Sequence, residues 1–349
     1  MLPVIVNRKI RIGVVGCGRI SKNHFDSIKK HADNIELTAV CDIDPQALTE
    51  HASEYAVSGY LDFEKMLAAE QLDLVALCTP SGLHPEQTIL AAEHGVNVIT
   101  EKPMATRWDD ALRMVNACDE ANVRLFVVKQ NRRNATLQLL KRAIDEKRFG
   151  KIHMVHLNVF WTRPQSYYDQ ARWRGTRELD GGAFMNQASH YVDLLDWLIG
   201  PVQSLHAMTS TTRDIEVEDT GVLNIRWRDG ALGSMSVTML TYPQNLEGSI
   251  TVLGERGTVR IGGVAVNDIQ IWQFDKTKEY DSSVKKINYE TNSVYGFGHP
   301  LYYRNVVDVL RGEAEPETDG REGLGSLELL TATYLSAHDG STVSLPLKR

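Results

Sequence analysis

The feature that most constrains the fold is a regular alternation of short apolar runs and polar helical stretches between Lys9 and Val128. The apolar runs are rich in Val, Ile and Leu, as expected of strands that are buried on both faces of a sheet. They are Ile10–Val15, Ile35–Cys41, Leu74–Cys78, Asn97–Thr100 and Arg124–Val128. Amphipathic stretches such as Ser21–Lys30 and Trp108–Glu120 lie between them. This order predicts βαβ units that form an α/β domain with a doubly wound parallel sheet, in residues 1–128.

The pattern changes beyond residue 128, where alternating strands dominate. They are His153–Trp161, Val202–Ser210, Thr220–Trp227, Leu232–Thr241, Ser249–Leu253 and Thr258–Ile261. Hairpin turns are expected at Arg228–Ala231 and Gly254–Gly257. The expected helices are Ala135–Lys147, Phe184–Leu198, Tyr302–Arg311 and Gly325–His338, and Asp275–Ser293 is expected to be a mobile surface loop. Residues 129–349 are therefore predicted to form an α+β domain with a large, mostly antiparallel sheet.

Composition excludes several classes of protein. The four cysteines, Cys17, Cys41, Cys78 and Cys118, form neither a C-x-x-C pair nor a cluster with histidines, which indicates a reduced protein without a metal site. The N-terminal residues do not resemble a signal peptide, and no apolar run is long enough to span a membrane. The net charge is -7 and the basic residues are dispersed, which argues against nucleic-acid binding. We expect a cytoplasmic protein with a small-molecule partner.

A glycine-rich turn follows the first predicted strand and has the sequence Gly16-Cys17-Gly18-Arg19-Ile20-Ser21. Gly16 can make the tight strand-to-helix turn, and Gly18 lets the backbone approach a pyrophosphate. Ser21 replaces the third glycine of the usual fingerprint but is small enough for close helix packing. The helix N-terminus that follows offers free N–H groups to phosphates. The turn, including Arg19 and Ile20, is therefore predicted to bind a dinucleotide in a Rossmann domain.

Asp42 lies at the end of the second predicted strand, and its charge narrows the choice between NAD and NADP. A carboxylate there can accept hydrogen bonds from an adenosine ribose, whereas it would repel the 2'-phosphate of NADP. The predicted cofactor is therefore NAD. The alternative is that Asp42 only starts a turn with Asp44-Pro45.

Two later strand ends belong to the same predicted crevice, because ligands of open α/β sheets bind at the carboxyl ends of the strands. Thr79, Pro80 and Ser81, followed by His84, come after the third strand, with helix capping before Pro85 as the alternative for Thr79–Ser81. Glu101-Lys102-Pro103 follows the fourth strand, and Lys129-Gln130 follows the fifth. A lysine held between a strand end and a proline can polarise a substrate oxygen beside a nicotinamide.

These motifs resemble the Gfo/Idh/MocA oxidoreductases, NAD(P)-dependent enzymes that mostly act on sugars and inositols. The resemblance covers nearly the whole chain, through Gly16-Cys17-Gly18, Glu101-Lys102-Pro103 and the Gly181-Gly182 turn before His190. Four longer runs are most similar to the family's UDP-N-acetylglucosaminuronate 3-dehydrogenases of lipopolysaccharide O-antigen biosynthesis. They are Lys129–Asn134, Phe160–Gln165, Asn186–His190 and Tyr242–Gly248. The resemblance implies oxidation of the sugar C3 hydroxyl to a ketone, which an aminotransferase can then aminate.

Oxidising a secondary alcohol requires a base for the hydroxyl proton and an electrophile for the developing alkoxide. His190 and Lys102 can supply these groups, and the alternative is that Lys102 itself, as a neutral amine, is the base. Asn186 lies four residues before His190, so one helix would place both side chains on the same face. In much of the family, the residue at the position corresponding to Asn186 resembles an aspartate. An asparagine cannot offset an imidazolium charge. Asp193, one turn after His190, can instead anchor the helix.

A UDP-uronate carries a carboxylate and a diphosphate, which arginine binds well. The segment Trp161–Gly175 is the richest source of cationic and aromatic groups, with a subunit contact as its alternative role. The predicted substrate-binding residues are Lys102, Lys129, Arg163, Tyr167, Asn186, Ser189, His190, Gln244, Asn245 and Tyr303. Gln130, Arg172 and Trp173 are predicted at the cofactor, the last two at its nicotinamide end.

Two other functions remain open from the sequence. One is a non-catalytic module that senses dinucleotide state, although such a module would not need Lys102 and His190. The other is an NAD-dependent dehydrogenase of another sugar or inositol. Family members of this shape pair through the sheet of the second domain, so we expect a homodimer or homotetramer.

Overall fold

The computed structural model describes residues 3–291, 294 and 296–348, which fold into two compact units. The first unit contains the chain up to Lys129 together with His299–Leu327. The second contains Gln130–Gly298 and the chain from Glu328 onward. The predicted division into 1–128 and 129–349 therefore misses the return of residues 299–327 to the first unit.

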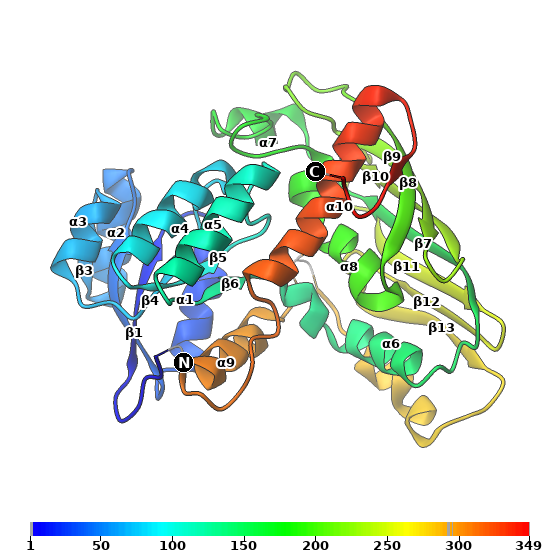
Figure 1. Ribbon diagram of the computed structural model, residues 1–349, viewed down its shortest axis with the longest axis horizontal. Coiled ribbons are helices and arrows are strands. Elements are labelled where there is room, and N and C mark those ends of the chain that lie inside the picture. The colour runs from blue at the N-terminus through cyan, green and yellow to red at the C-terminus, as the bar shows by residue number, and fades with distance from the viewer. Residues whose placement is uncertain (1–2, 292–293, 295, 349) are drawn as a thin grey trace. The chain divides into compact units, whose positions relative to one another are not determined.

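The first unit is built on a six-stranded parallel sheet with the order β3-β2-β1-β4-β5-β6 (Figure 1). Its strands are β1 (Ile10–Val15), β2 (Ile35–Cys41), β3 (Ser58–Tyr60), β4 (Leu74–Leu77), β5 (Asn97–Thr100) and β6 (Leu125–Val127). β1, β4 and β6 are almost wholly buried, which explains their continuous apolar sequence. The doubly wound parallel sheet is confirmed.

Helices connect these strands. They are α1 (Ser21–Lys30), α2 (Pro45–Tyr55), α3 (Phe63–Ala69), α4 (His84–Glu93) and α5 (Trp108–Glu120), with the short η1 (Ser81–Leu83) before α4. The Asp44 side chain accepts the Gln46 N–H, and Asp62 accepts the Lys65 N–H, so aspartates cap α2 and α3. α2 ends at Tyr55, and the next residue, Ala56, has a left-handed backbone that caps the helix.

The returning segment completes the core of the first unit. Its helix α9 (His299–Leu310) packs against α1 and contributes Tyr302, Val306 and Leu310 to the main apolar cluster of this unit. Thr318 then donates a hydrogen bond to the Val127 carbonyl at the end of β6. Sequence periodicity could predict α9 as a helix but not which unit it joins, because that depends on contacts between residues far apart in the chain.

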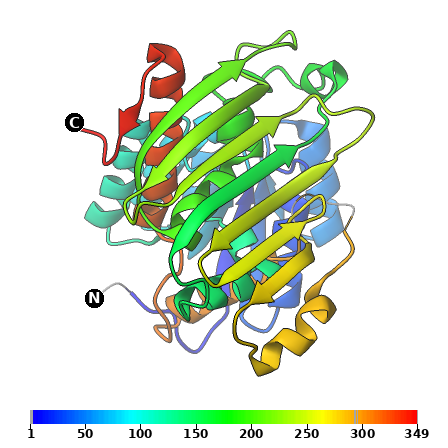
Figure 2. The same ribbon diagram turned by 90° about the vertical axis from the view of Figure 1, so that its right-hand side faces the viewer.

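The second unit contains an eight-stranded sheet with the order β13-β12-β11-β7-β10-β9-β8-β14 (Figure 2). Its strands are β7 (Ile152–Phe160), β8 (Val202–Ser210), β9 (Thr220–Trp227), β10 (Leu232–Thr238), β11 (Glu247–Gly254), β12 (Gly257–Gly262), β13 (Asp268–Phe274) and β14 (Val343–Ser344). β7 and β10 pair in parallel and the other neighbours are antiparallel. The predicted mostly antiparallel sheet is confirmed, with both predicted hairpins.

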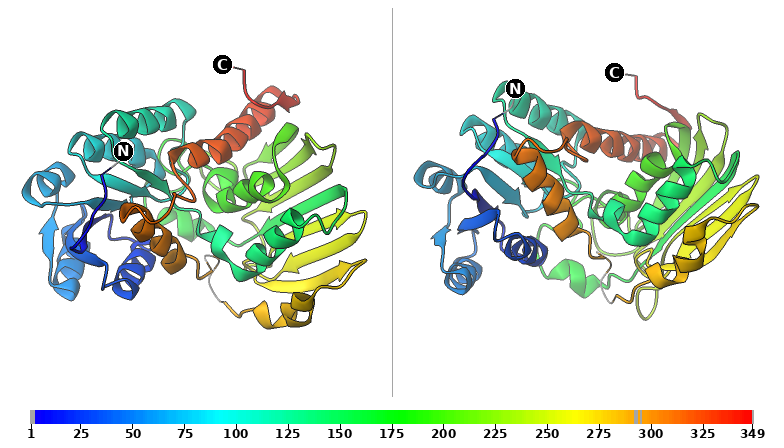
Figure 3. Two further views of the ribbon diagram at one scale, coloured as in Figure 1. Left: turned by 60° about the horizontal axis from the view of Figure 1, so that its bottom comes forward. Right: turned by 90° about the horizontal axis from the view of Figure 1, so that it is seen from below.

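Helices pack on one face of this sheet (Figure 3). They are α6 (Ala135–Asp145), α8 (Ser189–Ile199) and the later part of α10 (Gly320–Asp339). The indole of Trp227 donates to the Leu195 carbonyl, and Ser336 of α10 accepts the Ala207 N–H. Figure 2 shows the opposite face without a helix over it. That face presents Met154, Met208, Val222 and Leu232 among serines and threonines, and Met208 is 57% exposed.

Two local predictions differ from the structure. The expected helix Phe184–Leu198 is divided into a π-helical turn η3 (Ala183–Gln187) and α8, so Asn186 and His190 do not share one α-helix. The expected mobile loop Asp275–Ser293 contains η4 (Glu279–Ile287), where both Asp281 oxygens accept bonds of 2.7 Å from Arg148. This ion pair, in which Arg148 is buried and Asp281 half-buried, holds the segment, whose last two residues lie outside the described ones.

The described residues contain no helix that is both long and apolar enough to cross a membrane.

Candidate functional site

Gly16 occupies a position that only glycine suits. Its φ is +89°, and a β-carbon there would lie 2.9 Å from the backbone C and O of Cys78. The turn is thus pressed against the end of β4. Gly18 differs, because a β-carbon would meet nothing within 4 Å and its φ is ordinary. The space beside Gly18 is therefore open to a ligand that approaches the backbone.

The start of α1 has no side-chain cap among the described residues. The hydroxyl of Ser21 donates instead to the Gly18 carbonyl at 2.6 Å. The positive end of the helix dipole favours an anion at this turn, and a pyrophosphate is the anion that the predicted cofactor brings.

Asp42 lies at the end of β2 and contacts the same turn. Its Oδ2 accepts the Cys17 N–H at 2.6 Å, and its Oδ1 accepts the Asp44 N–H at 2.8 Å. Asp42 therefore does stabilise a turn with Asp44, which is the alternative that the sequence analysis gave. Each carboxylate oxygen still has acceptor capacity, and the side chain is half-buried, so a ribose hydroxyl can bind here as well.

The end of β4 is fixed by side-chain hydrogen bonds. The Thr79 hydroxyl donates to Gln87 at 2.6 Å, so it does not cap a helix N-terminus with this bond. The two His84 nitrogens lie 3.0 Å from the Thr79 carbonyl and 3.1 Å from the Pro103 carbonyl. Burial lowers the pKa of His84. His84 thus links the segment Thr79–Ser81 to the residues after β5, and these predicted cofactor residues meet at one edge of the sheet.

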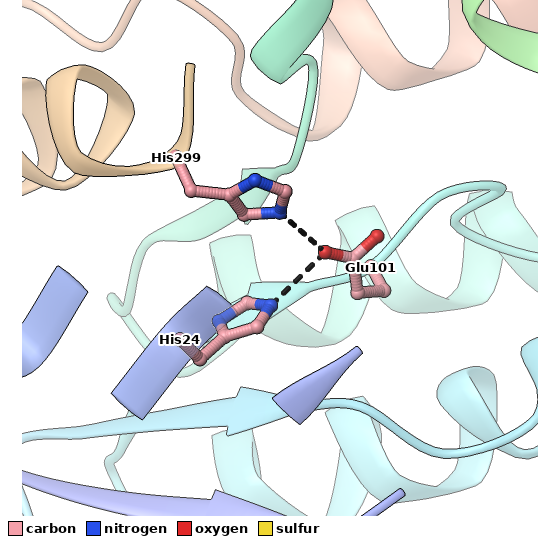
Figure 4. Close-up of side chains that lie close together, drawn as sticks. All are labelled: His24, Glu101 and His299. Atoms are coloured by element: carbon pink, nitrogen blue, oxygen red, sulfur yellow. Dashed lines mark hydrogen bonds and ion pairs between the residues drawn. The ribbon is translucent and has the colours of Figure 1, made fainter. Parts of the chain in front are cut away.

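A buried carboxylate joins three segments at the end of β5. Oε1 of Glu101 lies 3.0 Å from Nε2 of His24 in α1 and 3.2 Å from Nε2 of His299 in α9 (Figure 4). The other nitrogen of His24, Nδ1, lies 2.8 Å from the Tyr303 hydroxyl. All four side chains are buried. Sequence reasoning placed Glu101 at the cofactor but missed both histidines, which come from distant parts of the chain.

The protonation of this cluster follows from its contacts. Burial alone raises the pKa of the Glu101 carboxyl, but the hydrogen bonds from His24 and His299 outweigh burial and hold that pKa well below its usual range. Burial lowers the pKa of His299, and Glu101 opposes this only in part. Glu101 is therefore an anion at neutral pH, and His299 is a neutral N–H donor.

Lys102, Lys129 and Tyr303 occupy different environments in the first unit. Lys102 is half-buried, and its backbone N–H donates to Oε2 of Glu101 at 3.2 Å. Lys129 is buried after β6, and its ammonium donates to the Ser326 hydroxyl. Tyr303 is fully buried beside His24, a position that does not favour the direct substrate contact predicted for it.

In the second unit, Asn186 is held by a carboxylate that the sequence analysis did not consider. The Asn186 amide donates to Oδ1 of Asp180, whose Oδ2 accepts the Gly175 N–H at 2.7 Å. Asp180 is 1% exposed. His190 is buried in the first turn of α8, with Ser189 before it, and Asn186 lies in the preceding π-helical turn. An aspartate therefore holds the neutral Asn186 amide by a hydrogen bond.

Asp193 anchors α8, which is one of the roles that the sequence left open. Its two oxygens each accept a 2.7 Å bond from Arg132, from Nε and Nη2. Arg132 also lies over the Trp197 ring. This bidentate pair joins α8 to the short helix η2 (Gln130–Arg133).

The cationic and aromatic residues after β7 stack on one another. The Arg163 guanidinium lies 5.3 Å from the Tyr167 ring centre and 3.4 Å from Oδ1 of Asn245. Arg174, which the sequence analysis passed over, lies closer to Tyr167, at 4.3 Å, and also over Trp173. Arg172 is exposed, as is Gln244, whose backbone carbonyl accepts the Thr241 hydroxyl. Arg163 and Asn245 are therefore brought together, whereas Arg172 extends into solvent.

Amide side chains in and after η2 lack partners within the described residues. The amide of Gln130, the Oδ1 of Asn131 and the amide of Asn134 are buried, yet they make no hydrogen bond to a described residue. Buried polar atoms are normally satisfied, so such groups are suited to a ligand.

Comparison with known proteins finds a matching family model for each of two parts of the chain. Residues 10–129 match the family model for the NAD-binding Rossmann fold of the Gfo/Idh/MocA oxidoreductases, and residues 141–345 match the model for their C-terminal alpha/beta domain. The chain belongs to the Gfo/Idh/MocA oxidoreductase family. This confirms the resemblance found in the sequence, the predicted class of enzyme and NAD as its cofactor.

Two solved structures of this family are similar over the whole chain. The WlbA dehydrogenase from Chromobacterium violaceum, in complex with NADH and UDP-GlcNAcA, is 63% identical, with 100% of this chain and 99% of that chain covered and a TM-score of 0.96. The WlbA dehydrogenase from Bordetella pertussis, in complex with the same two molecules, is 64% identical, with coverages of 99% and 100% and a TM-score of 0.96. Among curated relatives, the D-apiose dehydrogenase of Paraburkholderia graminis is 28% identical over 97% of this chain and 90% of its own length.

The two glycines of the turn should respond differently to alanine in this Gfo/Idh/MocA oxidoreductase. Gly16→Ala forces a side chain into a left-handed backbone and against Cys78, so we expect a loss of about 1–3 kcal/mol of folding stability. Gly18→Ala should leave the stability within about 0.5 kcal/mol and weaken NAD binding, because the added methyl group fills the space open to the pyrophosphate. Thermal denaturation and NAD titration would measure the two effects. Equal loss of stability in both variants would contradict this account of the turn.

Proposed function

We propose that this chain oxidises the C3 hydroxyl of UDP-N-acetylglucosaminuronate to a 3-oxo sugar, with NAD as the hydride acceptor. The observation that carries the proposal is the 63–64% identity, over almost the full chain, to two dehydrogenases solved with NADH and UDP-GlcNAcA. We place the reaction in the cytoplasmic synthesis of lipopolysaccharide O-antigen sugars, where an aminotransferase consumes the product.

The first unit offers the groups that an NAD molecule requires. The open backbone beside Gly18, the uncapped start of α1 and the Asp42 carboxylate suit a pyrophosphate and a ribose. We assign Thr79–Ser81, His84 and the buried amide of Gln130 to the remainder of the cofactor. Bound NAD supplies the nicotinamide carbon that accepts the hydride from C3.

The chain's own residues must handle the proton and the charge that develops on oxygen. We assign His190 as the base that takes the hydroxyl proton. Asn186, which precedes His190 in the sequence, is oriented by its hydrogen bond to Asp180. Lys102 donates a hydrogen bond to the substrate oxygen as the C–H bond breaks. The Arg163, Tyr167 and Asn245 group, together with Lys129, suits the carboxylate and diphosphate of the nucleotide sugar.

A second candidate is the oxidation of a free sugar or inositol. The D-apiose dehydrogenase mentioned above and the myo-inositol 2-dehydrogenase of Thermotoga maritima, each 28% identical, cover 97% and 96% of this chain. Their lower identity makes them the weaker guide to the substrate.

We also propose that the sheet of the second unit pairs with a second copy of the chain, to give a dimer or tetramer. Its helix-free face carries exposed apolar side chains on several neighbouring strands, including Met154 (38%), Met208 (57%) and Leu232 (42%). Exposed apolar side chains grouped in this way are typical of contact surfaces.

The substrate can be tested directly. The purified enzyme is incubated with NAD and, separately, with UDP-N-acetylglucosaminuronate, UDP-N-acetylglucosamine, which lacks the sugar carboxylate, D-apiose and myo-inositol. It should form NADH and a 3-oxo product only with the uronate. Mass spectrometry and absorbance at the nicotinamide band would detect them. Turnover of inositol alone would refute the assignment.

The catalytic assignment predicts that Lys102→Ala and His190→Asn each lower kcat by at least about 100-fold, because each removes proton transfer or charge stabilisation. NAD should still bind to both variants. Steady-state kinetics and NAD titration would separate the two effects. His94→Asn and Lys30→Ala change the same residue types at exposed positions and should retain wild-type rates. A wild-type rate in Lys102→Ala or His190→Asn would remove that residue from the mechanism.

The proposed assembly predicts that Met208→Asp combined with Val222→Asp lowers the mass in solution to that of a monomer, because two charges would be buried between the sheets. Light scattering coupled to gel filtration would measure the mass. Leu61→Asp, at a 55% exposed position of the first unit, is the matched control and should leave the assembly intact. An unchanged mass in the double variant would exclude this face.

A further inference from the structure

The π-helical turn η3 takes its first hydrogen-bond acceptors from two residues outside the helix. The Ala183 N–H donates to the Glu218 carbonyl at 2.9 Å, and the Phe184 N–H donates to Oε1 of Glu218, also at 2.9 Å. The Met185 N–H donates to the Tyr334 hydroxyl at 3.2 Å. That hydroxyl donates in turn to Oε1 of Glu218 at 2.9 Å. Glu218 and Tyr334 thus accept three N–H groups that the start of a helix leaves without an intrahelical partner.

Both residues belong to the second unit, although they are far apart in the chain. Glu218 lies just before β9 and is 7% exposed, and Tyr334 lies in the part of α10 that packs in this unit. Burial raises the pKa of Glu218, and its hydrogen bonds oppose this only in part. A carboxyl group keeps an acceptor oxygen in either protonation state, so its bonds to the turn do not require a charge.

Gly182 precedes η3 and contacts this carboxyl group. A β-carbon at Gly182 would overlap Cδ and both carboxyl oxygens of Glu218. The φ of Gly182 is −92°, which other residues readily adopt, so glycine is favoured here by the contact with Glu218 rather than by the backbone conformation. The second glycine of the Gly181-Gly182 turn therefore leaves room for the group that accepts the Phe184 N–H.

The π-helical form of the turn affects how the side chains before and after it are directed. The Ala188 N–H donates at 2.8 Å to the Ala183 carbonyl, five residues back, whereas an α-helix uses the carbonyl four residues back. An α-helix rotates by about 100° per residue, so one more residue in a turn changes the direction of the side chains before it relative to those after it. Asn186 lies in the turn and His190 follows in α8. The turn therefore sets the direction of the Asn186 side chain relative to that of His190.

We propose that Glu218 and Tyr334 are positioning residues that hold η3 in its π-helical form, so that Asn186 and the start of α8 present their side chains to one substrate. The link to the substrate rests on the proposed function above, whereas the hold on the turn does not. Asp180 orients the side chain of Asn186 by a separate hydrogen bond. Glu218 and Tyr334 instead fix the backbone that carries Asn186.

Hydrogen exchange tests the hold on the turn without any substrate. Tyr334→Phe removes only the hydroxyl that accepts the Met185 N–H, so amide exchange in a peptide containing residues 183–188 should become about 3- to 10-fold faster, as measured by mass spectrometry. Tyr280→Phe is the matched control, because the Tyr280 hydroxyl donates to Glu146 at 2.9 Å in the same unit. It should leave exchange in this peptide unchanged. Wild-type exchange in Tyr334→Phe would overturn the proposal.

Steady-state kinetics tests the consequence for the reaction. Tyr334→Phe and Glu218→Ala should each lower kcat with UDP-N-acetylglucosaminuronate by about 10- to 100-fold, because a displacement of about 1 Å is enough for such a loss. The affinity for NAD should remain that of the wild type. Glu218→Gln keeps an acceptor oxygen and should retain kcat to within about 3-fold. Tyr280→Phe should retain the wild-type kcat.

Two kinetic results would contradict the positioning role. A lower melting temperature combined with a wild-type kcat in Tyr334→Phe would show that the residue only stabilises the fold. A loss in Glu218→Gln as large as that in Glu218→Ala would show that the charge of Glu218, rather than its hydrogen bonds, is required. If Glu218→Ala does not fold, Tyr334→Phe decides alone.

A double substitution tests the contact between Gly182 and Glu218. Gly182→Ala should displace the carboxyl group and lower kcat as Glu218→Ala does. The two substitutions together should lower kcat by no more than about 3-fold beyond Glu218→Ala alone, because the added methyl group then meets no carboxyl group. Losses that multiply would overturn this part of the proposal. If the wild-type enzyme does not turn over the nucleotide sugar, the proposed function fails, while hydrogen exchange still decides whether Tyr334 holds the turn.

Discussion

The fold of the first unit depends on the close approach of Gly16 to the backbone at the end of β4. Parallel strands place their carboxyl ends at one edge of a sheet, so the turn after β1, Asp42 after β2 and Lys102 after β5 lie along that edge. The distance between the turn and β4 is set by the missing side chain of Gly16, since a β-carbon would touch Cys78. The order of the strands thus brings the cofactor residues to one edge of the sheet, and the missing side chain of Gly16 sets how closely the turn approaches β4.

Charge at the same edge is organised by a second interaction, the acceptance of two imidazole N–H groups by Glu101. A buried carboxylate is unfavourable unless its oxygens are hydrogen-bonded, and His24 and His299 meet this requirement from two different helices. The same bonds fix the backbone from which Lys102 projects. In the second unit, Asp180 has a comparable relation to Asn186, since a buried carboxylate orients a neutral side chain that precedes α8. Both units therefore contain a buried carboxyl group that contacts a residue assigned to the substrate, Lys102 in the first unit and Asn186 in the second.

Local sequence patterns predicted much of this architecture, because burial on both faces or on alternate residues leaves a visible period. β1 and β9 begin and end where the sequence indicated. β3 was missed because Ser58-Gly59-Tyr60 is short, exposed and lacks the apolar signal. Gly16 and Asp42 could be selected because their motif is local. His24 and His299 could not, since they lie 77 and 198 residues from Glu101 and only the folded chain brings them together. The π-helical turn at Ala183–Gln187 leaves no sequence period that distinguishes it from an ordinary helix.

The return of residues 299–327 to the first unit has a consequence for how the protein is made. The strands of the six-stranded sheet leave the ribosome early. Tyr302, Val306 and Leu310, which belong to the same core, emerge only after Gln130–Gly298 of the second unit has been synthesised. Until then Glu101 lacks the donor from His299, and apolar surface on the sheet stays uncovered. A gene fragment that stops at Lys129 would encode every strand of the dinucleotide domain and still omit part of its interior, so the two units cannot be separated by cutting the chain once.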